Sequence, residues 1–298
     1  MSQSVSPKQI NSILAPNPSL DRQSDTDSSA LGDFVRETLA LTKRLFIQLQ
    51  RRPSTLVAGI IQPFMWLILF GALFSKAPQG LFGSDMNYAK FLAPGIIVFT
   101  AFSGALNAGL PVMFDREFGF LNRLLVAPLA SRYSIVAAST IYIIALSFVQ
   151  TAVIIGASAL LGAGLPSAVS LLAIASIVFL IVLGVTALSL GLAFALPGHI
   201  ELIAVIFVTN LPLLFASTAL APLDFMAGWL QVIASLNPLT YAIEPIRYLY
   251  LNSDWAIGSI VMSTPWLDIS FGGVILVLLG FDALILLAIQ PLLRRRFA

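Results

Sequence analysis

The stretch VSLLAIASIVFLIVLGVTALSLGLAFA, residues 169–195, contains no charged side chain and decides the class of fold. A helix needs about 20 consecutive apolar residues to cross roughly 30 Å of hydrocarbon. In lipid the backbone must satisfy its own hydrogen bonds, so an uncharged stretch of this length is expected to form a membrane-spanning α-helix. The chain is therefore expected to be an integral membrane protein.

Similar apolar runs recur along the chain of 298 residues. We expect an all-α fold with six transmembrane helices, at about 55–75, 91–113, 134–162, 168–196, 200–220 and 271–293. The composition agrees, because only 10% of the residues are charged, whereas a soluble domain has about 25%. Internal Gly and Pro are compatible with these helices, because neighbouring helices can satisfy the freed backbone groups.

Basic residues gather on alternate connections between the predicted spans. With six crossings, ten fall on one side: Lys43, Arg44, Arg51, Arg52, Arg116, Arg123, Arg132, Arg294, Arg295 and Arg296. Three fall on the other side, namely Lys76, Lys90 and Arg247. Because cytoplasmic loops carry the excess of Lys and Arg, we expect a multi-pass protein of the plasma (inner) membrane with both termini in the cytoplasm. A count of five or seven spans would break this agreement.

The chain ahead of the first span divides into two parts. Residues 1–32 are polar and are expected to form a disordered cytoplasmic tail, leaving 33–298 as the transmembrane domain. Residues 33–52 predict an amphipathic helix with Asp33 as its N-cap and an apolar face made of Phe34, Leu41, Leu45 and Leu49. This helix would lie in the membrane interface or, alternatively, pack on a partner in the cytosol.

A long connection, roughly residues 221–270, separates the fifth and sixth predicted spans. It contains two short apolar stretches, 225–234 and 239–250, on either side of Asn237 and Pro238. Stretches of this size are typical of re-entrant or interfacial helices. Three of the four Trp residues lie in this connection, as expected at a membrane surface. We therefore expect short external re-entrant helices before the last span.

The sequence lacks the residues and motifs that most enzymes use in catalysis. There is no Cys, His199 is the single His, and the pattern G-x-x-x-x-G-K-[ST] of an ATP-binding P-loop does not occur. A net charge of +2 gives no support for a nucleic-acid partner. The chain is expected to be neither an enzyme nor a metal protein by itself, and no cofactor is expected in this chain.

The polar segment DREFGFLNRLLVAPLASR, residues 115–132, falls on the predicted cytoplasmic side. It predicts a short amphipathic helix whose apolar face is Phe118, Leu121, Leu124 and Leu125 and which stops at Pro128. The helix could be an ordinary interfacial connector. It could also pass force from a cytosolic partner to the membrane part, and the spacing alone leaves both interpretations open.

This segment resembles the cytoplasmic motif of ABC-2 type transporter permeases, the membrane subunits of type-2 ABC exporters. The resemblance lies in an acidic residue, a glycine and a leucine-rich helix ending at a proline: Glu117, Gly119, Leu124, Leu125 and Pro128. It is especially close to the daunorubicin-resistance branch. The NPLTY phrase at 237–241 with Arg247, and FLAPG at 91–95, resemble other parts of that family. Together these similarities cover about residues 33–298.

The resemblance implies a permease that exports a hydrophobic or amphipathic substrate, such as a drug or a lipid, and that pairs with a second copy of itself as a homodimer. A separate ABC ATPase subunit would hold ATP and Mg. Glu117, Gly119, Arg123 and Pro128 would form the ATPase-coupling segment, with Glu117 and Arg123 as docking contacts and Gly119 allowing close approach. The pathway would lie between the two copies, lined largely by the second and fifth spans.

A few polar residues within or near the spans are further candidates for the pathway or a gate. Asp282 is either a structural hydrogen-bonding group or a proton-handling or ion-handling group, whereas Glu201 is expected at a solvated helix entrance. Asn107 and Asn210 could join helices or line the pathway, and Glu244 and Arg247 are expected to pair at i, i+3 or to form a gate. Two other functions therefore stay open, a secondary transporter driven by an ion gradient and a membrane-assembly component without transport.

Overall fold

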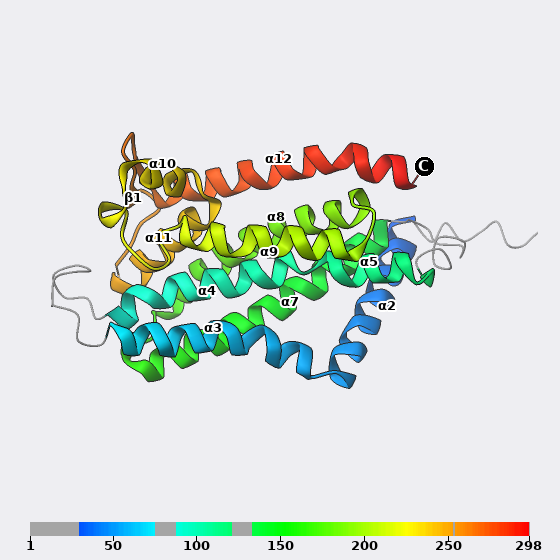
Figure 1. The fold of residues 1–298 in the computed structure, drawn as a ribbon, viewed down its shortest axis with the longest axis horizontal. Helices are drawn as coiled ribbons and strands as arrows, with labels where there is room; N and C mark the ends of the chain where they lie inside the picture. The colour runs from blue at the N-terminus through cyan, green and yellow to red at the C-terminus, as the bar shows by residue number, and fades with distance from the viewer. Residues whose placement is uncertain (1–29, 75–87, 121–132, 253, 298) are drawn as a thin grey trace, which may run out of the picture.

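Long helices lying side by side make up most of the molecule (Figure 1). The computed structural model describes residues 30–74, 88–120, 133–252 and 254–297. The long helices are α3 (Ser54–Leu73), α4 (Tyr88–Leu106), α7 (Tyr133–Ser158), α8 (Ala168–Ala195), α9 (His199–Phe215) and α12 (Phe271–Phe297). A short helix, α5 (Gly109–Glu117), continues α4 after a break, and a π-helical turn, η2 (Ala159–Ala163), prolongs α7.

The helical, membrane-spanning class is confirmed. Within the described part of the chain, five helical stretches are long and apolar enough to cross a bilayer: Ser54–Leu73, Tyr88–Glu117, Tyr133–Ala163, Ala168–Ala195 and Phe271–Pro291. The expected fifth span corresponds to α9, which has 17 residues and is the short member of the bundle. A sixth crossing therefore stays a prediction.

Helix α9 ends at Phe215 rather than continuing to residue 220. Its last carbonyl groups are satisfied by a side chain from farther along the chain, because Asn237 Nδ2 donates to the carbonyls of Leu213 at 2.7 Å and Ala216 at 2.6 Å. The same Asn237 begins α11 (Pro238–Leu251), since its Oδ1 accepts from the amide of Leu239 at 2.9 Å. One side chain thus ends α9 and begins α11.

At one end of the bundle, α2 (Ala30–Arg51) lies across the long helices and packs on α7 (Figure 1). We call this the α2 end; α5 and the C-terminal end of α12 lie there too. Arg44 forms an ion pair with Asp115 at 3.2 Å, and Ser134 Oγ donates to Glu37 at 3.0 Å. Because α2 begins at Ala30, Asp33 lies inside its first turn and is not the expected N-cap. Residues 1–29 of the expected tail lie outside the described residues.

The opposite end, the α11 end, carries the expected short helices, α10 (Gly228–Leu236) and α11 (Pro238–Leu251). A 3-10 turn, η3 (Leu223–Phe225), precedes them. A small antiparallel pair, β1 (Ile260–Ser263) and β2 (Asp268–Ser270), follows and was not expected from the sequence. Its side-chain pattern is too short to separate it from a loop.

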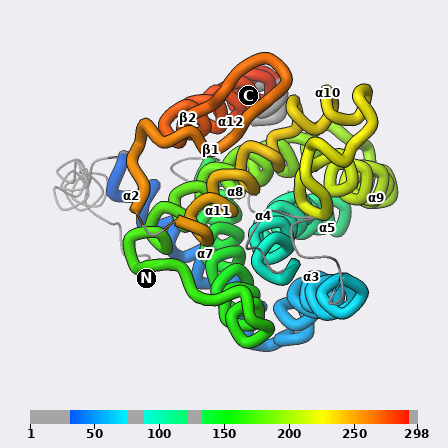
Figure 2. The backbone as a smooth tube through the Cα atoms, turned by 90° about the vertical axis from the view of Figure 1, so that its left-hand side faces the viewer, coloured from blue at the N-terminus to red at the C-terminus, as the bar shows by residue number. Residues whose placement is uncertain are grey.

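Helix α4 is central to the bundle. Viewed along the helices in Figure 2, it lies among the helices that it contacts, namely α3, α7, α8 and α11. Many of its side chains are completely buried, whereas α3 and α9 expose most of theirs. The exposed large apolar side chains of these two outer helices include Leu69, Leu73, Phe207 and Val208.

Candidate functional site

The break between α4 and α5 is held by a side chain from α8. Ser189 Oγ donates to the carbonyl of Leu106 at 2.6 Å and accepts from the amide of Gly109 at 2.9 Å. Glycine is required at 109, because a Cβ there would lie 2.4 Å from the carbonyl oxygen of Ser189. The start of α5 is thereby fixed to α8.

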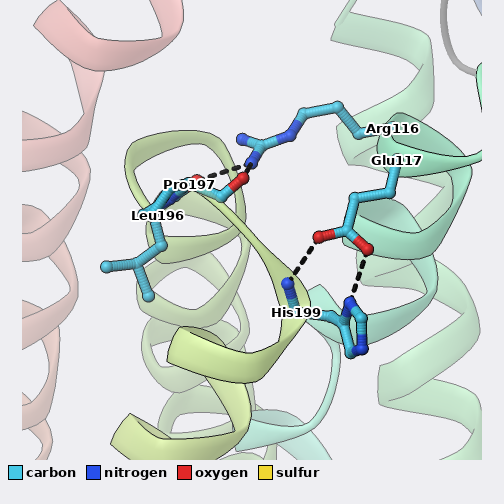
Figure 3. Close-up of polar contacts among 5 residues, drawn as sticks. All are labelled: Arg116, Glu117, Leu196, Pro197 and His199. Atoms are coloured by element: carbon cyan, nitrogen blue, oxygen red, sulfur yellow. Dashed lines mark hydrogen bonds and ion pairs between the residues drawn. The ribbon is translucent and has the colours of Figure 1, made fainter.

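The end of α5 is fixed to the same helix by Arg116 (Figure 3). Its guanidinium donates to the carbonyls of Ala193 at 2.8 Å, Leu196 at 2.5 Å and Pro197 at 2.7 Å. These carbonyls belong to the last turn of α8 and the residues after it, which lack partners within the helix and attract a cation.

The neighbouring Glu117 binds the start of α9 (Figure 3). Its carboxylate accepts from the backbone amide of His199 at 2.7 Å and pairs with His199 Nδ1 at 2.5 Å. An acidic group is favourable there because helix N-termini present free amides and a positive dipole end. Gly198 leaves the necessary room, since a Cβ at 198 would lie 2.8 Å from Glu117 Oε1. We call Arg116, Glu117 and His199 the brace.

The structure places the expected coupling residues as follows. Glu117, expected as a docking contact, is engaged within the chain, and sequence reasoning missed its partner His199. Gly119 follows α5 with a φ of +74°, so a glycine is favoured at this position because of its backbone conformation. Phe118 is 79% exposed beside the brace, which leaves its ring available to a partner. Arg123 and Pro128 lie outside the described residues.

Asn107 and Asn210 line one cavity of about 420 Å³, which we call the chamber. It lies between α3, α4, α5, α7 and α9, and Ser103 Oγ donates to Asn210 Oδ1 across it at 3.1 Å. Gln62 and Gln150 also line the chamber and were not among the expected site residues. The available signal was that each is an amide interrupting an apolar run.

At the α11 end, the expected pair between Glu244 and Arg247 is confirmed. Arg247 is 6% exposed, and its Nη2 donates to the carbonyl of Thr218 at 2.6 Å. The guanidinium also lies over the ring of Phe91 on α4. Arg247 therefore ties α11 to α4 and to the segment after α9, while a gating role for this pair stays a prediction.

Asp282 on α12 is 4% exposed and faces α8. A Cβ at Gly184 would lie 2.1 Å from Asp282 Oδ1, and no described residue forms a hydrogen bond with either carboxyl oxygen. Asp282 does not line the chamber. Glu201 lies exposed in the first turn of α9. Among the described residues, no group of three His, Asp or Glu side chains could hold a metal ion.

Several long apolar helices, packed side by side with polar side chains between them, are typical of a multi-pass membrane protein. The sequence pattern of the ABC-2 type transporter family matches residues 36–251, and the chain belongs to this family.

Three relatives show how the similarity is distributed. A protein of Cyanophora paradoxa named as transport permease ycf38 is 52% identical over 283 residues, covering 94% of this chain and 98% of its own length. The protein of the same name in Porphyra purpurea is 54% identical over 272 residues, covering 91% of this chain and 94% of its own. The Mycobacterium tuberculosis protein named as doxorubicin resistance ABC transporter permease protein DrrC is 27% identical over 221 residues, covering 72% of this chain and 76% of its own length.

Proposed function

We propose that this chain is the membrane-spanning permease subunit of an ATP-driven exporter whose ATP is hydrolysed by a separate ABC ATPase subunit. The brace is the observation that carries the proposal. It joins the end of α5 to both α8 and α9, with the exposed ring of Phe118 beside it. A partner that binds this end would therefore act on three helices at once.

The orientation and the sixth crossing belong to the same proposal. At about 1.5 Å per residue, the 17 residues of α9 extend about 25 Å, within the lower range for a span. Helix α2 and the C-terminal end of α12 lie at the same end of the bundle, as an even number of crossings requires (Figure 1). The basic residues of α2 gather at that end, which we assign to the cytoplasm of a cell with the protein in its inner membrane.

A second copy is proposed to lie against α3 and α9. These helices expose large apolar side chains, and between them Asn107 is exposed. An exposed amide within an apolar span is costly in lipid, so a partner or a water-filled pathway is favoured there. Lipid covers the rest of the apolar surface, and a hydrophobic or amphipathic substrate would pass between the copies.

The test is purification of the chain with its ATPase, followed by measurement of ATP hydrolysis and transport in vesicles. We expect Glu117→Arg to abolish transport while membrane insertion and dimerisation persist. The reason is that the positive Arg would be repelled by the positive dipole end at the start of α9, so the contact between residue 117 and His199 would be lost. Phe118→Asp is expected to weaken ATPase copurification, because it replaces the exposed ring with a charged carboxylate. Phe225→Asp is the matched control, because Phe225 is 58% exposed in η3, which precedes α10.

The outcomes separate docking from bracing. Full transport by Glu117→Arg would contradict the brace as the coupling element. Unchanged copurification of the ATPase with Phe118→Asp would place the docking surface elsewhere. Transport in the absence of any ATPase would overturn the proposed function as a whole.

A further inference from the structure

The chamber is polar without being charged. None of its lining residues in the described part of the chain is Asp, Glu, Lys or Arg. Its polar groups are side-chain amides and hydroxyls from α3, α4, α7, α9 and the α4–α5 break: Thr55, Gln62, Ser103, Asn107, Tyr142, Gln150 and Asn210. Its volume, about 420 Å³, falls within the range of about 300–1,000 Å³ that is typical of small-molecule sites.

Gln150 on α7 gives the chamber a specific unmet requirement. The side chain is 3% exposed, and its Oε1 has no hydrogen-bond partner among the described residues. A buried polar atom without a partner is destabilising, so an amide at this position is unfavourable unless something else binds it. Ser147, one helical turn earlier, also has a buried hydroxyl that no described residue binds.

Two glycines make room for the Gln150 amide. A Cβ at Gly59 on α3 would lie 2.3 Å from Gln150 Nε2, and a Cβ at Gly104 on α4 would lie 3.2 Å from Gln150 Oε1. Side chains at these positions would close the space around the amide. The chamber thus reaches from α3 and α4 to Gln150 on α7, inside a single copy of the chain.

The chemistry of the amide selects the group that can bind. The carboxamide of Gln150 has an acceptor oxygen, Oε1, and a donor nitrogen, Nε2, and the oxygen is the atom that lacks a partner among the described residues. A hydroxyl can donate to this oxygen, whereas a methyl ester can only accept. A full charge would have no opposite charge among the lining residues and would lose its hydration.

The chamber has a neighbour at the α2 end. A second cavity of about 610 Å³ shares Thr55, Pro111 and Tyr142 with it and is lined by two cations, Arg51 and Arg52, and by Asp115, which is paired with Arg44. An amphipathic molecule at that end would therefore meet cationic groups first, and the uncharged chamber farther along the helices. This order disfavours a cationic headgroup.

We propose that the chamber binds the neutral, hydroxyl-bearing headgroup of an amphipathic molecule, with Gln150 as the principal hydrogen-bonding residue. The proposal rests on the proposed export function, of which it names the substrate class.

The test uses the full-length chain alone in phosphatidylcholine nanodiscs. Four probes share one photoactivatable oleoyl chain and differ in their heads: a glycerol ester, a methyl ester, a phosphate and an amine. After irradiation, labelled peptides are mapped by mass spectrometry. We expect the glycerol probe to label α3, α4 or α7 within the chamber, and each of the other three to label it at least fivefold less.

Two variants and a control sharpen the result. Gln150→Leu is expected to lower labelling by the glycerol probe about fivefold, the effect of one net hydrogen bond. Ala58→Trp fills the chamber from the exposed side of α3 and is expected to abolish labelling there. Gln290→Leu makes the same chemical change at an exposed position of α12 that does not line the chamber, and labelling should be unchanged.

Equal labelling by the glycerol and methyl esters would overturn the proposal. So would wild-type labelling in both Gln150→Leu and Ala58→Trp, or a chamber that cannot be labelled because a second copy fills it. No ATPase is present in this assay. Failure of ATP-driven transport would therefore not change the result of the labelling assay. Failure of the labelling would not contradict the assignment of the chain as a permease.

Discussion

The guanidinium carbon of Arg247 lies 3.8 Å from the centre of the Phe91 ring, so a buried cation of α11 is stacked on the first turn of α4. Arg247 Nε also donates to the carbonyl of Phe91 at 3.3 Å. The planar guanidinium can stack and donate in several directions at once, which an ammonium cannot do. The contact between the two residues joins α11 to α4 at the α11 end of the bundle.

Arg247→Lys is therefore expected to lower the free energy of unfolding by about 1–3 kcal/mol, because the carbonyl of Thr218 loses its buried donor. Thermal unfolding in detergent measures the change. Arg36→Lys, at an exposed position of α2, is the matched control and should leave the midpoint unchanged. Equal midpoints for the two variants would show that the contacts of Arg247 do not stabilise the fold.

Ser189→Ala is expected to destabilise the protein by about 1–3 kcal/mol, because the carbonyl of Leu106 and the amide of Gly109 both lose their partner at the α4–α5 break. Ser176→Ala is the control, since its hydroxyl bonds within α8 to the carbonyl of Ala173. Hydrogen exchange of the Gly109 amide should rise in the first variant. A protected amide there would contradict the assigned role.

Gly119→Ala is expected to cost about 1 kcal/mol, because an L-residue adopts a φ of +74° only with strain. Among the described residues, no atom lies within 4 Å of the added Cβ, so the expected cost comes from the backbone conformation. Gly156→Ala in α7 is equally uncrowded but helical, and should stabilise the protein by up to about 1 kcal/mol. Chemical unfolding of both variants compares the two effects. A stabilised Gly119→Ala variant would rule out the conformational explanation.

Asp282→Asn tests the alternative of a transporter driven by an ion gradient. The substitution keeps the size and polarity of a side chain that is packed against Gly184 but removes its titration. If Asp282 is structural, transport driven by ATP should persist within about twofold, since an isosteric change costs little. Abolished transport, together with absence of a copurifying ATPase, would favour the ion-driven alternative.

The sequence predicts the long helices well because a bilayer demands uncharged runs of a fixed length, as in 169–195. It also predicts α2, whose apolar face repeats at helical spacing. The brace could not be predicted in the same way. Glu117 and His199 are separated by 82 positions, and the periodicity of neither helix indicates the other. The role of Ser189 is hidden for the same reason, because its hydroxyl acts on a break in a different helix.

Because α5 is attached to α8 at both its first and its last turn, it cannot swing as an independent lever. Any displacement of α5 must take α8 with it, and α8 packs along α12, where Gly191 lets Ile289 approach closely. A mechanical load applied near Phe118 would therefore reach the far side of the subunit through protein alone. Through the contact of Glu117 with His199, the same load would also reach the start of α9.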